Sequence, residues 1–231
     1  MVSNPVSIVL VHGAWADGSS WAKIITPLAA HGSTVTAAPL PLTSYADDVA
    51  ALDRTLARTQ GPVVLVGHAY AGAVIGGTRE ARVKALVYVA AVAPDEGETV
   101  ADAFYRGAPH PQAPKLAPDE HGLVYLPEAA FASAFAQNAA PAELTVLAAV
   151  QRPLSAICIT VPMQRPLWND RPSWFLVAEQ DRMIVGDNQR FMAERMKARS
   201  RAHAVDHTPM VTAPSLVTDI IREAVAHVTA G

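Results

Sequence analysis

Cysteine is nearly absent from this chain of 231 residues, in which Cys158 stands alone. A single thiol excludes an internal disulfide and suits a reducing compartment. Charged residues make up only 17% of the chain, the formal net charge is −3, and the Lys and Arg residues are scattered. We therefore expect neither nucleic acid nor an anionic membrane surface as a partner.

Long hydrophobic runs are missing as well. No run reaches the length that a bilayer-spanning helix needs, and the N-terminus lacks the charged segment and cleavage site of a signal peptide. A cytoplasmic location is the resulting expectation. The length predicts one domain over residues 1–231, and a hydrophobic content of 51% is enough for one large core. The sequence does not decide whether the chain forms a homodimer.

Short apolar runs alternate with longer amphipathic segments along the chain. Apolar runs predict strands at 6–11, 34–37, 63–66, 83–89, 173–178 and 202–205. Helical spacing predicts helices at 20–30, 44–59, 187–198 and 215–229, with one more beginning at Ala71. This alternation predicts an α/β fold with a doubly wound parallel sheet of about six strands.

The span 93–169 interrupts this rhythm. It carries eight prolines before Ile157 and several aromatic residues, and it lies between two predicted core strands. Ligands of open α/β sheets bind beyond the carboxyl ends of the strands, where this span begins and ends. We interpret it as an inserted lid or cap, with ordinary helical packing on the sheet edge as the alternative.

One short stretch carries the chemical signal. Gly67-His68-Ala69-Tyr70-Ala71-Gly72 follows a predicted strand and opens a predicted helix. Strand, tight turn and helix in this order are the setting of a nucleophile elbow, G-x-S-x-G, which exposes a serine oxygen above a sheet. Here the serine position is Ala69, whose methyl group cannot attack a carbonyl.

Other polar residues follow predicted strands in a telling order. His12 follows the first strand, Asp181 the fifth and His207 the last. Elbow, acid and histidine appear in the chain order of the α/β-hydrolases. Asp181 competes with Glu179 and Asp206 for the acid position, and His207 competes with His203.

Four stretches together carry a resemblance to a known superfamily. They are 9–21, 65–70, 178–181 and 206–210, the last with Pro214 nearby. On these motifs the chain resembles the α/β-hydrolase fold superfamily over nearly its whole length. It is most similar to small bacterial esterase-like members and to the plant methyl esterase and hydroxynitrile lyase group.

The resemblance implies acyl transfer by a Ser-Asp-His triad, which needs no cofactor and no metal. His207 would be the base and Asp181 its orienting partner, which the family's spacing favours over the other acids. Asp95 is a second acid candidate, of the kind some hydrolases use. The backbone N–H groups of Ala14 and Tyr70 would form the oxyanion hole.

Further residues are expected around the substrate, a small ester, lactone or thioester. His12 is interpreted as a structural brace of the first loop, and Cys158 as a buried structural thiol. No dinucleotide fingerprint, phosphate loop or clustered metal ligands are seen in the sequence. The residues expected to contact the substrate are Trp15, His68, Met210, Phe104, Tyr105, Tyr125 and Trp168.

Ala69 admits two accounts. Either a serine was replaced to trap a ligand, or the alanine is natural in a non-hydrolytic relative. The completeness of the surrounding apparatus favours the first account, in which the chain as printed is inactive. The second account leaves open a His/Asp-driven lyase, a cofactor-free oxygenase or a ligand-binding receptor. Thr208 stands where the plant lyases have a lysine, which counts against cyanohydrin cleavage.

Overall fold

The fold is built on a six-stranded sheet of parallel strands. The computed structural model describes residues 5–230, so most of the N-terminal segment behind the signal-peptide expectation lies outside it. Neighbouring strands pair in the order β2-β1-β3-β4-β7-β8. The strands are β1 (Ser7–Val11), β2 (Thr34–Ala38), β3 (Val63–His68), β4 (Val83–Val89), β7 (Ser173–Ala178) and β8 (Arg199–His203). This confirms the expected fold class.

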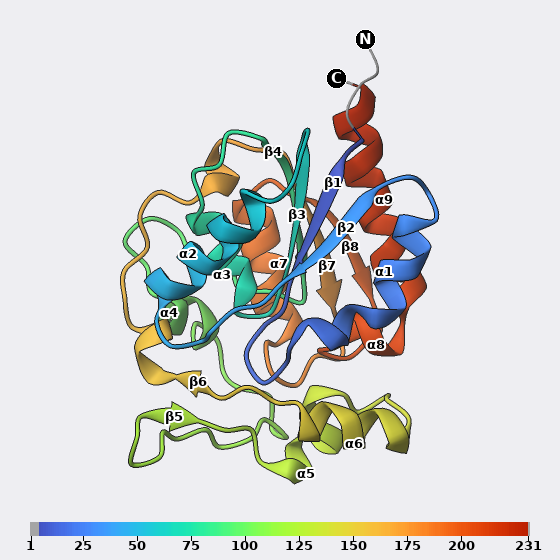
Figure 1. The fold of residues 1–231 in the computed structure, drawn as a ribbon. Helices are drawn as coiled ribbons and strands as arrows, with labels where there is room; N and C mark the ends of the chain where they lie inside the picture. Colours follow the sequence, from blue (N-terminus) through green and yellow to red (C-terminus); the bar gives the residue numbers. More distant parts are fainter. Residues whose placement is uncertain (1–4, 231) are drawn as a thin grey trace.

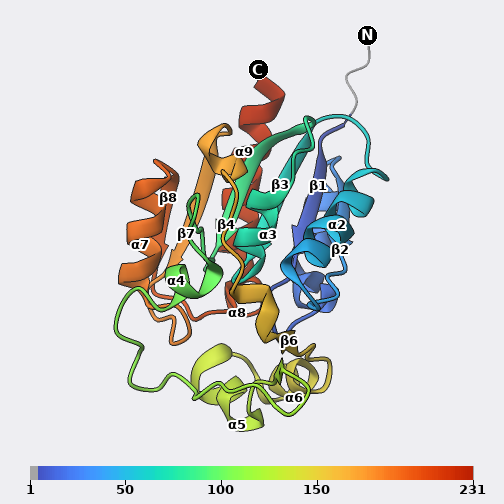
Figure 2. The same cartoon turned by 90° about the vertical axis from the view of Figure 1, so that its left-hand side faces the viewer.

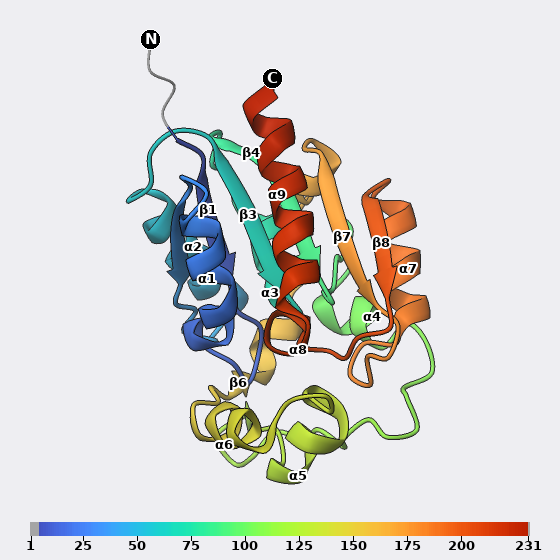
Figure 3. The ribbon, with the colours of Figure 1, turned by 90° about the vertical axis from the view of Figure 1, so that its right-hand side faces the viewer.

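Helices cover both faces of the sheet, as the near-continuous burial of β1, β3 and β7 requires. Helices α1 and α9 lie on one face, and α2, α3 and α7 on the other (Figures 2 and 3). Ser44 caps α2 by accepting a hydrogen bond from the N–H of Asp47. The helices are α1 (Ala22–Ala29), α2 (Tyr45–Leu56), α3 (Ala71–Gly77), α7 (Gly186–Arg195), α8 (Pro209–Thr212) and α9 (Pro214–Ala230).

Most of the span between β4 and β7 lies beyond the carboxyl ends of the strands, and we call this part, residues 100–159, the cap (Figure 1). Two short antiparallel strands, β5 and β6, pair within it. The elements of the cap are α4 (Val100–Phe104), β5 (Leu123–Val124), α5 (Glu128–Ala130), the π-helical turn η2 (Phe131–Phe135), α6 (Pro141–Ala149), β6 (Leu154–Ser155) and the 3-10 turn η3 (Ala156–Ile159). A further 3-10 turn, η4 (Leu167–Asn169), packs on α3 just before β7.

Two of the boundaries that differ from the sequence prediction have a clear physical reason. The last strand covers Arg199–His203 rather than 202–205. It is a sheet-edge strand with exposed polar residues, so it carries no apolar run to mark it. The predicted helix at 20–30 begins instead with a 3-10 turn, η1 (Gly18–Trp21), because Asp17 accepts a hydrogen bond from the N–H of Ser19.

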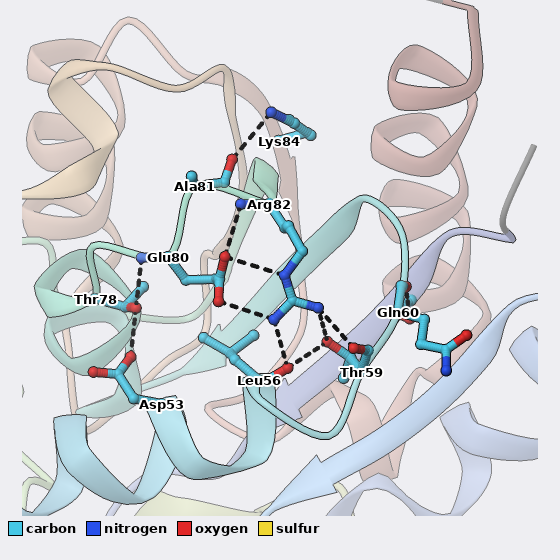
Figure 4. A network of polar contacts seen from close by, with 10 residues as sticks. Asp53, Leu56, Thr59, Gln60, Thr78, Glu80, Ala81, Arg82 and Lys84 are labelled. Carbon is cyan, nitrogen blue, oxygen red and sulfur yellow. Dashed lines mark hydrogen bonds and ion pairs between the residues drawn. The ribbon is translucent and has the colours of Figure 1, made fainter.

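A polar network around Arg82 lies at the amino ends of the strands, opposite the cap (Figure 4). Its guanidinium donates to the carbonyl oxygens of Leu56 and Thr59, at 2.8 and 2.6 Å, and to the Glu80 carboxylate. The hydrogen bonds that Glu80 accepts from Arg82 lower the pKa of its carboxyl group to about 2. The network ties the end of α2 to the turn before β4, far from the carboxyl ends of the strands.

Over 5–230, no helix is both long and apolar enough to cross a bilayer. The same residues contain no group of three or more His, Cys, Asp or Glu side chains placed to hold a metal ion.

Candidate active site

The turn between β3 and α3 has the strained geometry of a nucleophile elbow. Ala69 has φ +50°, in the left-handed region that costs an L-residue about 1–2 kcal/mol. Its N–H donates to Val89 O at 3.3 Å, and its carbonyl accepts from Val92 N at 3.1 Å. Strained residues of this kind persist where the surroundings fix them, and they gather at functional sites.

Two glycines permit the close approaches that this turn needs. A Cβ atom on Gly72 would lie 2.1 Å from the carbonyl oxygen of Val92. A Cβ atom on Gly13 would lie 2.8 Å from the Cβ of Ala69. The His12-Gly13 loop and the segment after β4 therefore press directly against the elbow.

Asp181 and His207 come together beside this turn. Asp181 follows β7, His207 follows β8, and His207 Nδ1 lies 2.7 Å from Asp181 Oδ2. Both side chains are buried, and His207 Nε2 has no protein partner among the described residues. A histidine that donates Nδ1–H to a carboxylate keeps a lone pair on Nε2, the arrangement of a general base.

The Asp181 carboxylate is held by hydrogen-bond donors only. Oδ1 accepts from the N–H groups of Met183 and Ile184, at 2.7 and 2.9 Å. Oδ2 accepts from Gln189 Nε2 at 2.8 Å as well as from His207. A carboxylate surrounded by donors acts as an acceptor, which is its ionised form.

The competing residues make other contacts. Glu179 forms an ion pair with Arg190, and Asp206 accepts from the N–H of Asn138 and from Thr208 and Thr212. Asp95 Oδ1 accepts from the N–H of Glu96. His203 lies within β8. Of the acids considered, the structure therefore brings only Asp181 into hydrogen-bond contact with His207.

Two buried histidines brace the site from behind. His68 Nε2 donates to the carbonyl oxygen of His207 at 2.7 Å, and the two rings lie 4.8 Å apart. His12 Nε2 accepts from the N–H of Leu40, so its Nδ1–H donates to Gly13 O. Burial lowers the pKa of His12, and lowers that of His68 further, so both rings stay neutral.

The backbone N–H groups of Ala14 and Tyr70, the residues expected to form the oxyanion hole, have no hydrogen-bond acceptor within the described part of the chain. Buried backbone N–H groups are almost always paired, so two unpaired ones beside a single cavity are unusual. Donors that converge on one place stabilise the negative oxygen of an acyl-transfer intermediate.

A cavity of about 160 Å³ adjoins these groups. Ala14, Trp15, Ala69, Tyr70 and His207 line its inner end, and Phe104 and Tyr105 contribute from the cap. No Asp, Glu, Lys or Arg side chain is in the lining. Sequence reasoning did not single out the other lining residues, which are Val92, Val100, Ala101, Leu116, Pro118, Val124, Leu154, Ala156, Ile159, Met183 and Ile184.

Four residues expected to contact substrate do not line the cavity. Val124 lines the cavity, and neighbouring side chains in an extended segment face opposite ways. The next residue, Tyr125, therefore points away from the cavity and is 50% exposed. Trp168 donates Nε1–H to Pro94 O. Met210 is fully buried within α8, which packs on α9. His68 lies behind His207, as described above.

Part of the cap is fastened to the loops that carry the acid and the base. Asn138 N–H donates to Asp206, and Gln137 donates to the carbonyl of Gln180. Phe135 packs 5.2 Å from the His207 ring. On the other side, Trp15 donates Nε1–H to Val124 O at 2.9 Å. These contacts make this part of the cap a wall of the site.

A family model for the alpha/beta hydrolase family matches residues 8–220. The chain belongs to this family. As an alpha/beta hydrolase it shares the elbow, acid and histidine order described above. No curated protein matches it significantly in sequence.

Solved structures similar to this alpha/beta hydrolase include three named hydrolases. Polyneuridine aldehyde esterase is 18% identical over 95% of this chain and 99% of its own, with a TM-score of 0.81. A pyrethroid hydrolase from Sphingobium faniae JZ-2 is 21% identical over 96% and 98%, with a TM-score of 0.81. A methylesterase protein from Arabidopsis is 17% identical over 96% and 99%, with a TM-score of 0.77. At these identities the likeness shows the fold.

Proposed function

We propose that this fold hydrolyses small, uncharged esters, lactones or thioesters when serine occupies position 69. One observation carries the proposal: the His207–Asp181 pair and the unpaired N–H groups of Ala14 and Tyr70 adjoin the same cavity as Ala69. A serine oxygen there would attack the carbonyl while His207 Nε2 takes its proton. The developing oxyanion would bind the two N–H groups.

The cavity limits the substrate. Its lining holds no charged side chain, and about 160 Å³ is close to the roughly 150 Å³ of an apolar cavity that binds benzene. The portion of substrate buried inside is therefore neutral and no larger than a small aromatic or branched group. Tyr105 lines the cavity while remaining 58% exposed, so it marks the mouth through which a longer portion extends.

The chain as printed would bind such an ester without forming an acyl-enzyme, because Ala69 supplies no nucleophile. The test is Ala69→Ser, assayed with p-nitrophenyl and methyl esters of small acids. We expect at least about a thousandfold gain over the Ala69 chain, since a triad nucleophile contributes up to six orders of magnitude elsewhere. Ala69→Ser combined with His207→Gln is the matched control. Equal rates for these two variants would refute the proposal.

A second candidate rests on Ala69 itself. If the alanine is native, the same base and N–H pair serve a reaction without a nucleophile, in which His207 removes a proton from the bound ligand. The Ala69 chain would then exchange the α-hydrogens of a neutral ketone such as phenylacetone in D₂O, and His207→Gln would not. Proton NMR measures this exchange. The second candidate requires α-hydrogen exchange faster than in buffer alone, whereas simple ligand binding gives no exchange above that rate.

A further inference from the structure

Asp48 is a buried carboxylate that the proposed acyl-transfer chemistry does not use. It lies on α2 with 0% of its surface exposed. Oδ1 accepts from the N–H of Leu42 at 2.7 Å, and Oδ2 accepts from the Tyr70 hydroxyl at 2.7 Å. The Cys158 thiol lies 3.8 Å from Oδ2. No Lys, Arg or His in the described chain forms an ion pair with it.

The contacts of Asp48 suit a hydrogen-bond acceptor. The Leu42 N–H can only donate, and the Tyr70 hydroxyl donates to Oδ2. Burial raises the pKa of Asp48, and its hydrogen bonds to Tyr70 and Leu42 counteract this rise. Burial also raises the pKa of the Tyr70 phenol, and raises that of Cys158 to about 12, so both keep their protons. The hydrogen bonds thus favour the ionised form of Asp48, while burial opposes it.

Tyr70 joins this cluster to the elbow. Its backbone N–H is an unpaired donor beside the cavity, and Tyr70 directly follows Ala69, whose φ is +50°. Its phenol is fixed at the far end by the 2.7 Å hydrogen bond to Asp48, and a buried hydrogen bond is costly to break. Turning the Ala69–Tyr70 peptide would move a side chain that is held at its tip.

The same carboxylate also reaches the cap. Leu42, which donates to Asp48 and has φ +59°, accepts from the N–H of Ser155 in β6 at 2.9 Å. Cys158 lies on η3, whose Ala156 and Ile159 line the cavity. Asp48 thus connects the oxyanion side of the site with one wall of the cavity.

We propose that Asp48 is a positioning residue that fixes the Tyr70 N–H in the oxyanion hole through the tyrosine side chain. The inference rests on the proposed function, because it assigns that N–H to the negative oxygen of acyl transfer. Asp48 touches no substrate, and its effect passes through Tyr70.

Kinetics in the Ala69→Ser background test this role. Asp48→Asn and Tyr70→Phe should each lower kcat about 10- to 100-fold with KM changed less than about threefold, since a misplaced oxyanion donor affects mainly the transition state. The matched controls are Asp53→Asn, which removes a hydroxyl-bonded carboxylate from the far end of α2, and Tyr45→Phe on the same helix. Both should leave kcat unchanged. Thermal unfolding of every variant identifies the temperature range in which all variants are folded. Within that range, Asp48→Asn and Tyr70→Phe would leave kcat unchanged if Asp48 and Tyr70 only stabilised the fold.

Binding to the Ala69 chain tests the same role without turnover. Benzoate would place a negative oxygen on the N–H pair, while benzyl alcohol is a neutral ligand of similar size. Tyr70→Phe and Asp48→Asn should weaken benzoate about tenfold and benzyl alcohol less than twofold, measured by NMR titration. Equal losses for both ligands, or no benzoate binding by the Ala69 chain, would overturn the inference.

The two experiments separate the two proposals. The esterase function is refuted if the Ala69→Ser variant is inactive. The positioning role is still supported in that case if Tyr70→Phe in the Ala69 chain weakens the binding of benzoate selectively. An active Ala69→Ser variant whose kcat is unchanged by Asp48→Asn and Tyr70→Phe supports the function and refutes the positioning role.

Discussion

Gln189 donates to the same oxygen of Asp181 that accepts from His207. Gln189 is fully buried on α7, and its Nε2 also donates to Ile184 O at 2.7 Å. Its Oε1 accepts from the N–H of Ala178, the last residue of β7, at 2.9 Å. Because Ala178 N–H only donates and Ile184 O only accepts, the orientation of the amide is fixed. A neutral amide therefore holds the Asp181 carboxylate in place, and His207 is the only ionisable side chain among the hydrogen-bond partners described for that carboxylate.

Replacing this amide should destabilise the fold. Gln189→Leu leaves the Ala178 N–H and Ile184 O without partners in a buried place, and each such loss costs about 1–3 kcal/mol. We expect the free energy of unfolding to fall by about 2–5 kcal/mol in urea titrations, given that range. Gln164→Leu, at an exposed position, is the control and should change it by less than about 0.5 kcal/mol. A Gln189→Leu chain as stable as the control would contradict this role for the amide.

Gly72 should tolerate no side chain. The Cβ of an alanine there would lie 2.1 Å from the carbonyl oxygen of Val92, a backbone atom that cannot swing away. We expect Gly72→Ala to cost about 3 kcal/mol or more, or to prevent soluble expression. Gly107→Ala is the matched control, because its Cβ would meet nothing within 4 Å. Similar unfolding curves for the two variants would show that the backbone around the elbow can shift to accommodate a Cβ atom at position 72.

The sequence predicts the centre of the site better than its surroundings. Ala69, Asp181 and His207 follow three separate strands, and parallel strands end at the same edge of a sheet, so strand prediction alone brings them near one another. The partners Asp48 and Gln189 carry no such signal. Each is one polar residue on an amphipathic helix, and only the packing of that helix decides which atoms it meets.

The cap shows the other limit of prediction. The aromatic residues between β4 and β7 suggest a pocket, yet Phe104 and Tyr105 line the cavity while Tyr125 and Trp168 do not. Which of them face the site depends on short strands and turns whose direction is set by contacts with distant loops, such as the Trp15–Val124 hydrogen bond. Local periodicity is too brief in such segments to fix a face.

The buried histidines should make the fold sensitive to mild acid. Burial lowers the pKa values of His12 and His68 below the ordinary 6.5, so beneath that pH the unfolded chain binds protons that the folded chain does not. Stability is therefore fully present above pH 6.5 and decreases as the pH falls. The slope is at most about 1.4 kcal/mol per pH unit for each histidine, reached between its folded-state and unfolded-state pKa values, and at most about 2.7 for both.

Urea unfolding at pH 7.5, 6.5 and 5.5 measures this loss directly. His68→Gln, whose amide can still donate to His207 O, should reduce the slope below pH 6.5 by about half, because one of the two histidines responsible is gone. His121→Gln, at a ring with 74% of its side chain exposed, should leave the slope unchanged. A free energy of unfolding that stays constant from pH 7.5 to 5.5 would show that the folded protein takes up protons at His12 and His68 as readily as the unfolded chain does.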